Sequence, residues 1–539
     1  MKMPLARLPH LSALGLVLVL SACGSTVDGV AELPSTGFTA PATGPTVPAS
    51  TPDPSPSATP TIPTSLPDTT PEDPSTSGSA PVSPTVPAVD GEVGATGIGD
   101  PYYPESGNGG YDVQDYLVEL TWNDKDSSIQ AKTTIAATVT SKEKLGQFSF
   151  DFQETLKVAS VTINDRPTAF EQTPAKLVLT PEVGLEPDSD LVVVVTYSGV
   201  PNAVSHGTAG LGDGGWVTLP DGGAVVAGEP LSASTWFPAN EHPLDRASFQ
   251  VIATVPEGWS VISNGLPIDD LPAPATGSAV FGWREKAPMA TYLTTLYIDK
   301  FTTTTGTTGD GVPIINAFAP NGGDKFGPLA EKTAGIVDFL SSTFGTYPFE
   351  SVGGIYSNLP LSFALETQTR PVYADWVDLD TVVHELAHQW YGDDIAVKSW
   401  ADICLNECFA SYAPWLYREA TEGEDLDATY RQNIAAYKGD KSFWASPLVD
   451  MGAGNEFTAV YSRGPLALHA LRNEIGDDAM DALLSGWVKE KAGKNVSFDE
   501  WEAYVNDVAG KDLTPFLDAW FRGTTIPAKK YLFPGSLAG

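Results

Sequence analysis

Between Tyr111 and about Phe301, short apolar segments alternate with turn-rich ones. Within several of the apolar segments, hydrophobic and polar side chains alternate residue by residue, which is the pattern of strands with one buried face. The predicted strands are YLVELTW (116–122), TTIAATV (133–139), FSFDF (148–152), LVVVVTYSG (191–199), SFQVIATV (248–255) and TYLTTLYI (291–298). Segments rich in Gly, Pro and Asp separate them. The pattern predicts an antiparallel β domain.

Beyond residue 325 the hydrophobic spacing changes to the helical period. The segments with this period are GPLAEKTAGIVDFLSSTF (327–344), the stretch around residues 384–390, ECFASYAPWLYREA (407–420), RGPLALHALRNEI (463–475) and LTPFLDAWF (513–521). The folded part is therefore predicted to be α+β. A β domain over residues 106–302 precedes a mainly α domain over residues 303–539.

The first 105 residues show neither period. Residues 1–22 begin with two basic side chains, continue with an apolar run and end in Leu-Ser-Ala before Cys23, which resembles the signal peptide of a bacterial lipoprotein. We expect cleavage before Cys23 and a lipid anchor on its sulfur, with an ordinary signal peptide as the alternative. Residues 23–105 are dominated by Pro, Ser, Thr, Ala and Gly, which favours a disordered stalk.

Charge limits the classes of partner. The 539-residue chain carries 30 Lys and Arg against 67 Asp and Glu, which gives a formal net charge of −37. Because nucleic-acid binding requires a basic surface, no nucleic-acid partner is expected. His206, His242 and His469 have no ligand spacing, so we expect surface or packing roles for them.

Four residues form a pattern typical of catalytic zinc sites. In HELAHQW (384–390), His384 and His388 lie four residues apart, so a helix brings both imidazoles to one metal ion. Glu385 lies beside them, where a carboxylate can take a proton from a zinc-activated water. Glu407 would supply the third ligand from a second helix and leave the fourth position for water or substrate. One Zn²⁺ per chain is predicted; the alternative is a chance match on an amphipathic helix.

Two cysteines flank the predicted third ligand. Cys404 and Cys408 stand four residues apart, a spacing that separates Cβ atoms on a regular helix by about 5–6 Å. A disulfide requires about 3.5–4.5 Å between these atoms. We therefore expect two reduced, buried thiols, with a cysteine ligand to zinc as the alternative.

The spaced motifs HELAHQWYGDD and LNECFASY resemble the membrane alanyl aminopeptidase family, the aminopeptidase N and leukotriene hydrolase group of gluzincins. The stretches at 236–265 and 288–301 are similar to the family's amino-terminal domain, and LTPFLDAWFRGTTIP (513–527) is similar to the end of its catalytic domain. The resemblance covers about residues 110–530. It implies a saddle-like β domain and a thermolysin-like zinc peptidase domain, in a short form that lacks the family's C-terminal domains.

The resemblance also implies three residues that contact a substrate. The family's GxMEN loop, whose glutamate holds the free α-amino group, matches FALET (363–367), which makes Glu366 the amine ligand, although the motif's glycine and asparagine are not kept. Counting nine residues back from Pro238 gives Glu229 as a second amine ligand. The oxyanion-binding tyrosine of a YxKG motif corresponds to Tyr461. The alternatives are an exposed strand residue for Glu366 and a tyrosine packed at a helix start.

These observations predict a zinc aminopeptidase at the cell surface that releases N-terminal residues from peptides with free N-termini. One alternative is an endopeptidase that uses the same zinc site. Another is a surface lipoprotein that binds peptides without catalysis. The preferred first residue and the oligomeric state are left open by the sequence.

Overall fold

The computed structural model describes residues 88–205, 211–220, 222–359 and 361–538. The predicted signal peptide, Cys23, residues 23–87 and His206 lie outside the described residues. No helix in these described ranges combines the length and the apolar character needed to cross a membrane.

The packed part of the chain begins earlier than the predicted boundary at residue 106. Asp100 is 3% exposed, and its side chain accepts a hydrogen bond from the backbone N–H of Trp400 at 2.9 Å. The hydroxyl of Tyr102 donates to Asp450 at 2.8 Å. Composition alone misassigned residues 88–105 to the stalk, because these ordering contacts come from residues far away in the sequence.

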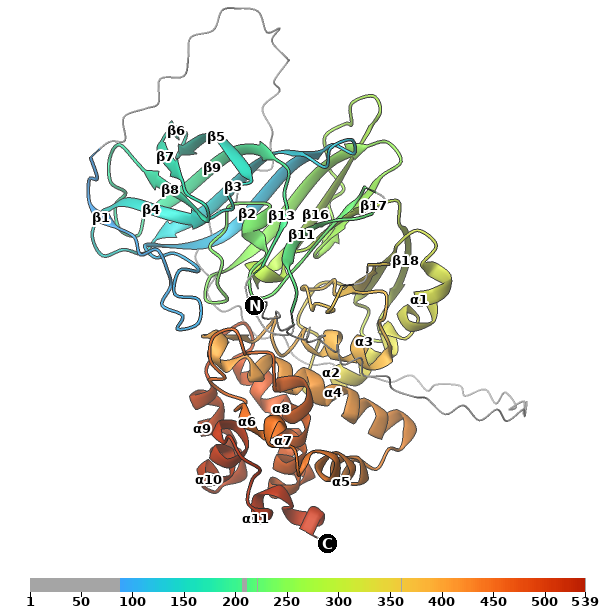
Figure 1. Cartoon of the computed structure of the whole chain (residues 1–539). Helices are drawn as coiled ribbons and strands as arrows, with labels where there is room; N and C mark the ends of the chain where they lie inside the picture. The colour runs from blue at the N-terminus through green and yellow to red at the C-terminus, as the bar shows by residue number, and fades with distance from the viewer. Residues whose placement is uncertain (1–87, 206–210, 221, 360, 539) are drawn as a thin grey trace, which may run out of the picture. The chain divides into compact units, whose positions relative to one another are not determined.

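The largest sheet has eight strands in the order β15-β16-β13-β2-β3-β9-β5-β6 (Figure 1). Its strands are β2 (Tyr111–Trp122), β3 (Ile129–Val139), β5 (Leu156–Ile163), β6 (Arg166–Pro167), β9 (Asp190–Gly199), β13 (Arg246–Pro256), β15 (Leu266–Pro267) and β16 (Ser278–Ala290). Burial follows the sequence pattern: in β13, Phe249, Val251, Ala253 and Val255 are buried and alternate with partly exposed residues.

Two smaller sheets complete the β domain, in the orders β1-β4-β8-β7 and β10-β11-β12-β17-β14. Their strands are β1 (Glu92–Val93), β4 (Leu145–Asp151), β7 (Ala169–Gln172), β8 (Lys176–Thr180), β10 (Ala203–Val204), β11 (Gly214–Thr218), β12 (Ala224–Ala227), β14 (Ser260–Ser263) and β17 (Leu296–Asp299). The predicted strand at 291–298 is in fact a 3₁₀ turn, η2 (Thr291–Leu293), followed by β17; a second 3₁₀ turn, η1, spans Ala233–Thr235.

The sheets are mixed rather than antiparallel. β2 and β13 pair in parallel at the centre of the large sheet, and β1 pairs in parallel with β4. The prediction of an antiparallel domain was wrong at these pairs because alternation reports which face of a strand is buried and carries no information on direction.

The second domain begins with a sheet that helical periodicity did not predict. Its order is β18-β19-β20-β21. The strands are β18 (Thr302–Thr307), β19 (Pro313–Phe318), β20 (Val352–Tyr356) and β21 (Val372–Tyr373), and a further pair joins β22 (Ala396–Val397) to β23 (Asn495–Val496). Helices make up most of the remainder, so the predicted order of β domain and then mainly α domain is confirmed.

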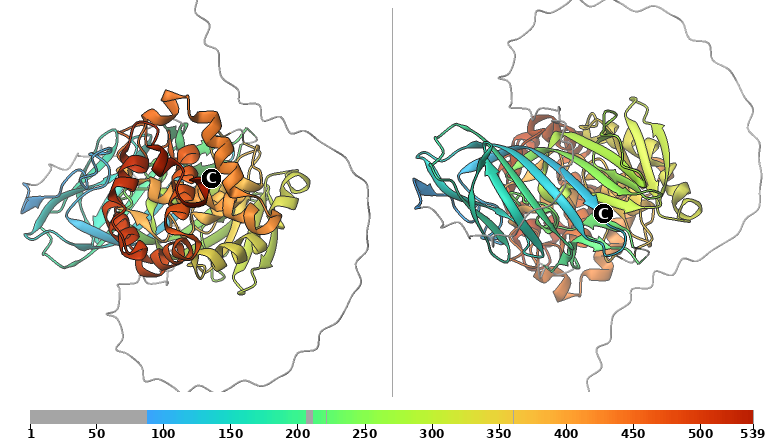
Figure 2. Two further views of the ribbon diagram at one scale, coloured as in Figure 1. Left: turned by 90° about the horizontal axis from the view of Figure 1, so that it is seen from below. Right: turned by 90° about the horizontal axis from the view of Figure 1, so that it is seen from above.

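Most of the helices lie together below the β domain in the view of Figure 1, and Figure 2 shows the same arrangement from below and from above. The helices are α1 (Gly323–Ala330), α2 (Thr333–Phe344), α3 (Leu379–Ala387), α4 (Cys404–Glu422), α5 (Leu426–Tyr437), α6 (Lys441–Ala445), α7 (Val460–Ile475), α8 (Asp477–Lys491), α9 (Phe498–Ala509), α10 (Thr514–Leu517) and α11 (Lys529–Leu532). The shorter turns are η3 (Trp400–Asp402), the π-helical η4 (Asp518–Arg522) and η5 (Gly535–Ala538).

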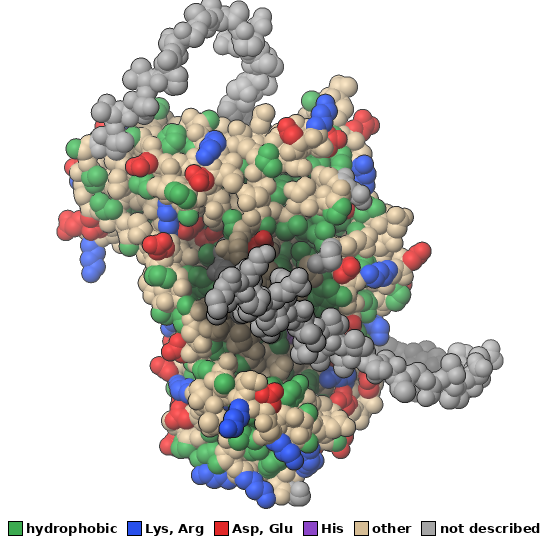
Figure 3. Space-filling view, in the orientation of Figure 1, with side chains coloured by type: hydrophobic (Ala, Val, Ile, Leu, Met, Phe, Trp, Pro, Cys, Tyr) green, Lys and Arg blue, Asp and Glu red, His purple; other side chains and the backbone are tan. Residues whose placement is uncertain are grey.

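Buried polar contacts join the two domains. Arg246 of β13 donates to the backbone oxygens of Asp393 and Asp394 at 2.7 and 3.0 Å. The Asn264 side chain donates to the backbone oxygen of Gln368 at 2.7 Å. These contacts fix the β domain against the loops that lead into and out of α3. On the face shown in Figure 3, Lys and Arg side chains are scattered among acidic ones over most of the surface and stand closer together at the lower end of the view.

Candidate active site

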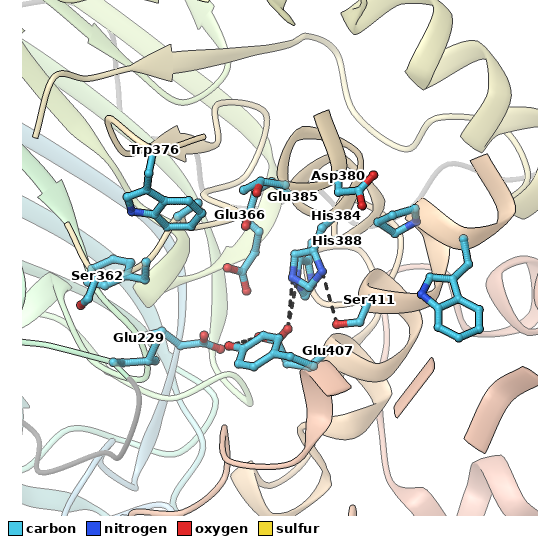
Figure 4. Close-up of a pocket in the computed structure, with 17 residues that line it drawn as sticks. Glu229, Ser362, Glu366, Trp376, Asp380, His384, Glu385, His388, Glu407 and Ser411 are labelled. Atoms are coloured by element: carbon cyan, nitrogen blue, oxygen red, sulfur yellow. Dashed lines mark hydrogen bonds and ion pairs between the residues drawn. The ribbon is translucent and has the colours of Figure 1, made fainter. Parts of the chain in front are cut away.

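The predicted metal, catalytic and substrate-binding residues line one cavity of about 390 Å³ (Figure 4). Its walls are Leu211, Glu229, Ser362, Phe363, Ala364, Glu366, Trp376, Asp380, Thr381, His384, Glu385, His388, Glu407, Ser411, Pro414, Trp415 and Tyr461. The β domain contributes Glu229, and the second domain contributes most of the rest. The structure therefore brings together residues that the sequence places hundreds of positions apart.

The predicted ligands come from two adjacent helices. The Asp378 carboxylate caps α3 by accepting from the Thr381 N–H at 2.9 Å, and this helix presents His384, with His388 directly after its last residue. Glu407 lies in the first turn of α4. Since α3 and α4 pack against each other, the three side chains meet between them.

The geometry of these ligands fits one tetrahedral ion. The Nε2 atoms of His384 and His388 are 3.1 Å apart, and Oε2 of Glu407 lies 3.3 and 3.4 Å from them. Ligand atoms placed 2.0–2.1 Å from a tetrahedral zinc ion would be about 3.3 Å apart. Oε2 of Glu407 is buried and has no hydrogen-bond partner, as expected of an oxygen that serves as a metal ligand.

Neighbouring groups orient the ligands. Nδ1 of His388 lies 2.9 Å from the backbone oxygen of Tyr391, so this nitrogen carries the proton and Nε2 keeps its lone pair for the metal. Nδ1 of His384 lies 3.4 Å from the Ser411 hydroxyl. Burial raises the pKa of Glu407, but the two imidazoles outweigh this effect and lower it to about 2. The third ligand is therefore ionised.

Three further carboxyl groups lie beside the metal ligands. Glu229, Glu366 and Glu385 are all buried, and burial raises the pKa of each; neighbouring carboxylates add to this rise, while His388 opposes it at Glu366 and Glu385. Ligand atoms of Glu366, Glu385 and His388 all lie within 4.8 Å of one another. The raised pKa values favour the neutral form of these carboxyl groups, so they carry negative charge only when cations lie beside them. A metal ion and an ammonium group would supply that positive charge.

Glu366 projects from a tight turn at the edge of the second domain's sheet. Leu365 and Val372 exchange two backbone hydrogen bonds at 2.8 and 2.9 Å, and Thr369 takes a left-handed conformation with φ of 64°. The hydroxyl of Tyr292 from the β domain donates to Glu366 at 3.3 Å. The turn thus directs Glu366 into the cavity rather than to solvent, where the alternative interpretation placed it.

Glu229 reaches the same cavity from the β domain. It follows β12 and precedes Pro230, with a cis peptide bond between the two. One of its carboxylate oxygens, Oε1, is buried and has no hydrogen-bond partner. In Figure 4 Glu229 and Glu366 lie on one side of the histidines, while Asp380 and Ser411 lie on the other.

Tyr461 stands at the start of α7, and the residue is 42% exposed. Its hydroxyl donates to Oε1 of Glu407 at 3.3 Å, so it lies next to the ligand cluster. Arg463, in the same motif, points away and donates to the backbone oxygens of Trp520 and Gly523 at 2.7 and 2.9 Å. The motif therefore combines one exposed side chain in the cavity with one structural cation.

The structure contradicts the prediction of two reduced thiols. Cys404 and Cys408 form a disulfide with a Cα–Cα distance of 4.8 Å, within the usual range of 4.4–6.8 Å. The estimate from regular helix geometry failed because the first turn of α4 brings these two Cα atoms closer together than the about 6 Å that a regular helix gives at this spacing. Neither cysteine is available as a zinc ligand.

Several residues of the site had no signal in the sequence. Tyr292 and Ser411 contact predicted site residues, and Trp376 and Trp415 contribute aromatic rings to the cavity wall. The sequence analysis assigned no role to any of these four residues. The two described histidines without ligand spacing have packing roles, because His242 pairs with Asp100 at 3.2 Å and His469 with Asp427 at 3.0 Å.

Comparison with known proteins identifies the family of both domains. The peptidase M1 N-terminal domain matches residues 111–293, and the peptidase family M1 domain matches residues 360–520. Aminopeptidase N of Streptomyces lividans is 24% identical over 320 residues, which are 54% of this chain and 37% of that protein. Glutamyl aminopeptidase of Bitis rhinoceros is 24% identical over 338 residues, 57% of this chain and 35% of that protein. The chain thus spans about a third of the length of these relatives.

Solved structures of similar length also match. The M1 zinc metallopeptidase from Deinococcus radiodurans has a TM-score of 0.70 and 29% identity, and the match covers 80% of this chain and 98% of that one. A mutant of that enzyme bound to a Tyr-Ser-Ala substrate matches equally well. A two-domain M1 zinc metallopeptidase mutant bound to L-tryptophan matches with a TM-score of 0.71 and 28% identity.

Both halves of the described chain carry this likeness, and the ligand geometry fits the metal of the solved neighbours. The predicted family resemblance and the predicted zinc cofactor are confirmed. The chain belongs to the peptidase M1 family of zinc metallopeptidases.

Proposed function

We propose that the protein is a zinc aminopeptidase that removes single residues from the free N-terminus of peptides. The observation that carries this proposal is the pair of buried carboxyl groups, Glu229 and Glu366, beside the metal ligands. Glu366 has ligand atoms within 4.8 Å of His388 and Glu385. An ammonium group bound there leaves room for one residue before the scissile carbonyl.

The chain's own residues divide the chemistry among them. His384, His388 and Glu407 hold zinc, which when bound supplies a Lewis acid that acidifies water and polarises a carbonyl. Glu366 and Glu229 bind the substrate ammonium and orient the first residue. Glu385 takes a proton from the attacking water and returns it to the leaving amine. The Tyr461 hydroxyl donates to the oxyanion of the tetrahedral intermediate.

Matched short peptides with free and acetylated N-termini test the proposal. The purified protein should cleave only the free form, and Glu385→Gln should cleave neither. Cleavage of both forms would instead favour an endopeptidase. Cleavage of neither by the wild type, with peptide binding retained, would favour a binding protein without catalysis.

We also propose that the protein is exported and anchored to the cell surface through a lipid on Cys23. The support is the sequence of residues 1–23, which precede the described part of the chain. The wild type should enter the detergent phase in detergent partitioning of cell extracts, and Cys23→Ser should stay in the aqueous phase. Equal partitioning of the two would contradict the anchor.

A further inference from the structure

Gln389 follows the second metal-binding histidine and takes no part in the chemistry described above. Its side chain is fully buried. Nε2 donates to the backbone oxygen of Glu366 at 3.1 Å and to Oδ2 of Asp393 at 2.7 Å. Oε1 accepts from the backbone N–H of Thr369 at 2.7 Å. One amide thus forms hydrogen bonds with two backbone groups of the turn that carries Glu366.

The orientation of this amide is fixed by its partners. A carbonyl oxygen and a carboxylate face Nε2, and an N–H group faces Oε1, so rotating the amide by half a turn would leave Glu366 O and Thr369 N without partners. A buried backbone group without a partner costs about 1–3 kcal/mol. Gln389 therefore has one arrangement, and it holds the turn in one position relative to α3.

The β domain holds the other side of the same turn. Asn264 donates to the oxygen of Gln368 at 2.7 Å, and the Gly265 N–H donates to the Thr369 hydroxyl at 2.7 Å. Thr369 keeps its left-handed backbone between these two sets of contacts. Of the anchors named here, Gln389 is the one that lies on the same segment as the metal ligands.

We propose that Gln389 is a positioning residue for amine recognition. It sets the distance between the Glu366 carboxylate and the metal ligands by joining the Glu366 turn to the segment that carries His388. The substrate's own covalent bonds fix the separation of its amine from its first carbonyl, so both must be matched within about 0.5 Å. This inference rests on the proposed function, because it assumes that Glu366 binds the substrate amine.

The test compares binding of L-tryptophan with binding of 3-indolepropionate, the same molecule without its amine. Gln389→Met keeps the shape of the side chain and removes its hydrogen bonds. We expect the inhibition constant of L-tryptophan to rise about tenfold and that of 3-indolepropionate to change less than twofold, with zinc content unchanged. A general structural defect would weaken both ligands and lower the zinc content.

A double-mutant cycle with Glu366→Ala shows whether Gln389 affects L-tryptophan binding through Glu366. If Gln389 acts through Glu366, adding Gln389→Met to Glu366→Ala leaves L-tryptophan binding unchanged within twofold. If the two substitutions weaken L-tryptophan binding additively, this inference is overturned and the proposed function is not affected. If Glu366→Ala itself spares the preference for the amine, the proposed function is overturned and this inference with it.

Two further variants keep the test decisive. Gln368→Met is a matched control, because Gln368 is equally buried in the same turn but its amide reaches Ala287 of the β domain at 3.5 Å instead of α3. It should change the ratio of the two inhibition constants less than threefold. If Gln389→Met does not fold, Gln389→Asn replaces it. This variant retains an amide, but its side chain is too short to form both hydrogen bonds with the turn. It should show the same selective loss, and equal weakening of both ligands would overturn the inference.

Discussion

The metal-binding half of the cleft and the amine-binding half are specified over different ranges of sequence. The metal ligands lie within residues 384–407, on two helices that pack directly against each other. Glu229 and Glu366 come from the β domain and from a turn held by both domains. The first half depends mainly on local helix geometry, whereas the second depends on domain packing. Changes in the two halves should therefore affect different measured quantities.

The largest expected effect is in the metal-binding half. Glu385→Gln removes the general base, which contributes about 10²–10⁴-fold in comparable sites. We expect kcat to fall at least about 10³-fold. Zinc content and the inhibition constant of L-tryptophan should stay near wild type, since this side chain binds neither. A variant that lost its zinc would show that Glu385 is needed to assemble the site.

Tyr461→Phe removes one hydroxyl and leaves the ring. Loss of one donor to an oxyanion costs about 10²–10³-fold in kcat. We expect a loss of this size with less than a threefold change in KM, measured by steady-state kinetics. A change confined to KM would place Tyr461 in substrate binding and contradict its assignment to the oxyanion.

A smaller effect depends on pH and concerns the contact between the two domains, on which the amine-binding half relies. Glu285 of β16 is fully buried in the contact between the domains, with Oε2 unpartnered, and burial raises its pKa from 4.5 to about 7. Between these two values the folded state holds a proton that the unfolded state has released. The stability from this group is therefore present below pH 4.5 and is lost as the pH rises through 7. The loss is at most about 3 kcal/mol.

Glu285→Gln should flatten this dependence. Urea unfolding at pH 5 and pH 8 gives the free energy of unfolding of both proteins, and we expect the wild type to lose more stability than the variant between the two. Equal losses would show that Glu285 is not the group that titrates. Glu350→Gln should flatten the dependence less than Glu285→Gln does, because the Glu350 charge adds to the rise in the Glu285 pKa but burial is its main cause.

The smallest expected effect is that of the disulfide beside Glu407. Its loop is short, with a sequence separation of 4, so the chain-entropy model gives about 2 kcal/mol of stabilisation. The double variant Cys404→Ser, Cys408→Ser should lower the free energy of unfolding by about this amount and keep its zinc. Loss of zinc would show that the metal-binding half relies on the disulfide as well as on helix packing.

The metal-binding half could be predicted from the sequence more fully than the amine-binding half, because local helix geometry positions the first and contacts between distant segments position the second. The helical spacing of His384 and His388 sufficed for the metal ligands, and alternation sufficed for strands such as β13. Tyr292, Gln389 and the parallel pairing of β2 with β13 depend on contacts between distant segments, which no local period reports. The disulfide was missed because the two cysteines lie closer together in the first turn of α4 than in the regular helix on which the estimate relied.

The position of each cut is the most direct test of the central claim, that one residue lies between the amine-binding carboxylates and the metal. A pentapeptide with a free N-terminus should be shortened one residue at a time, and mass spectrometry should show the tetrapeptide before the tripeptide. Initial products that lack two or more N-terminal residues, formed without the tetrapeptide, would contradict the account.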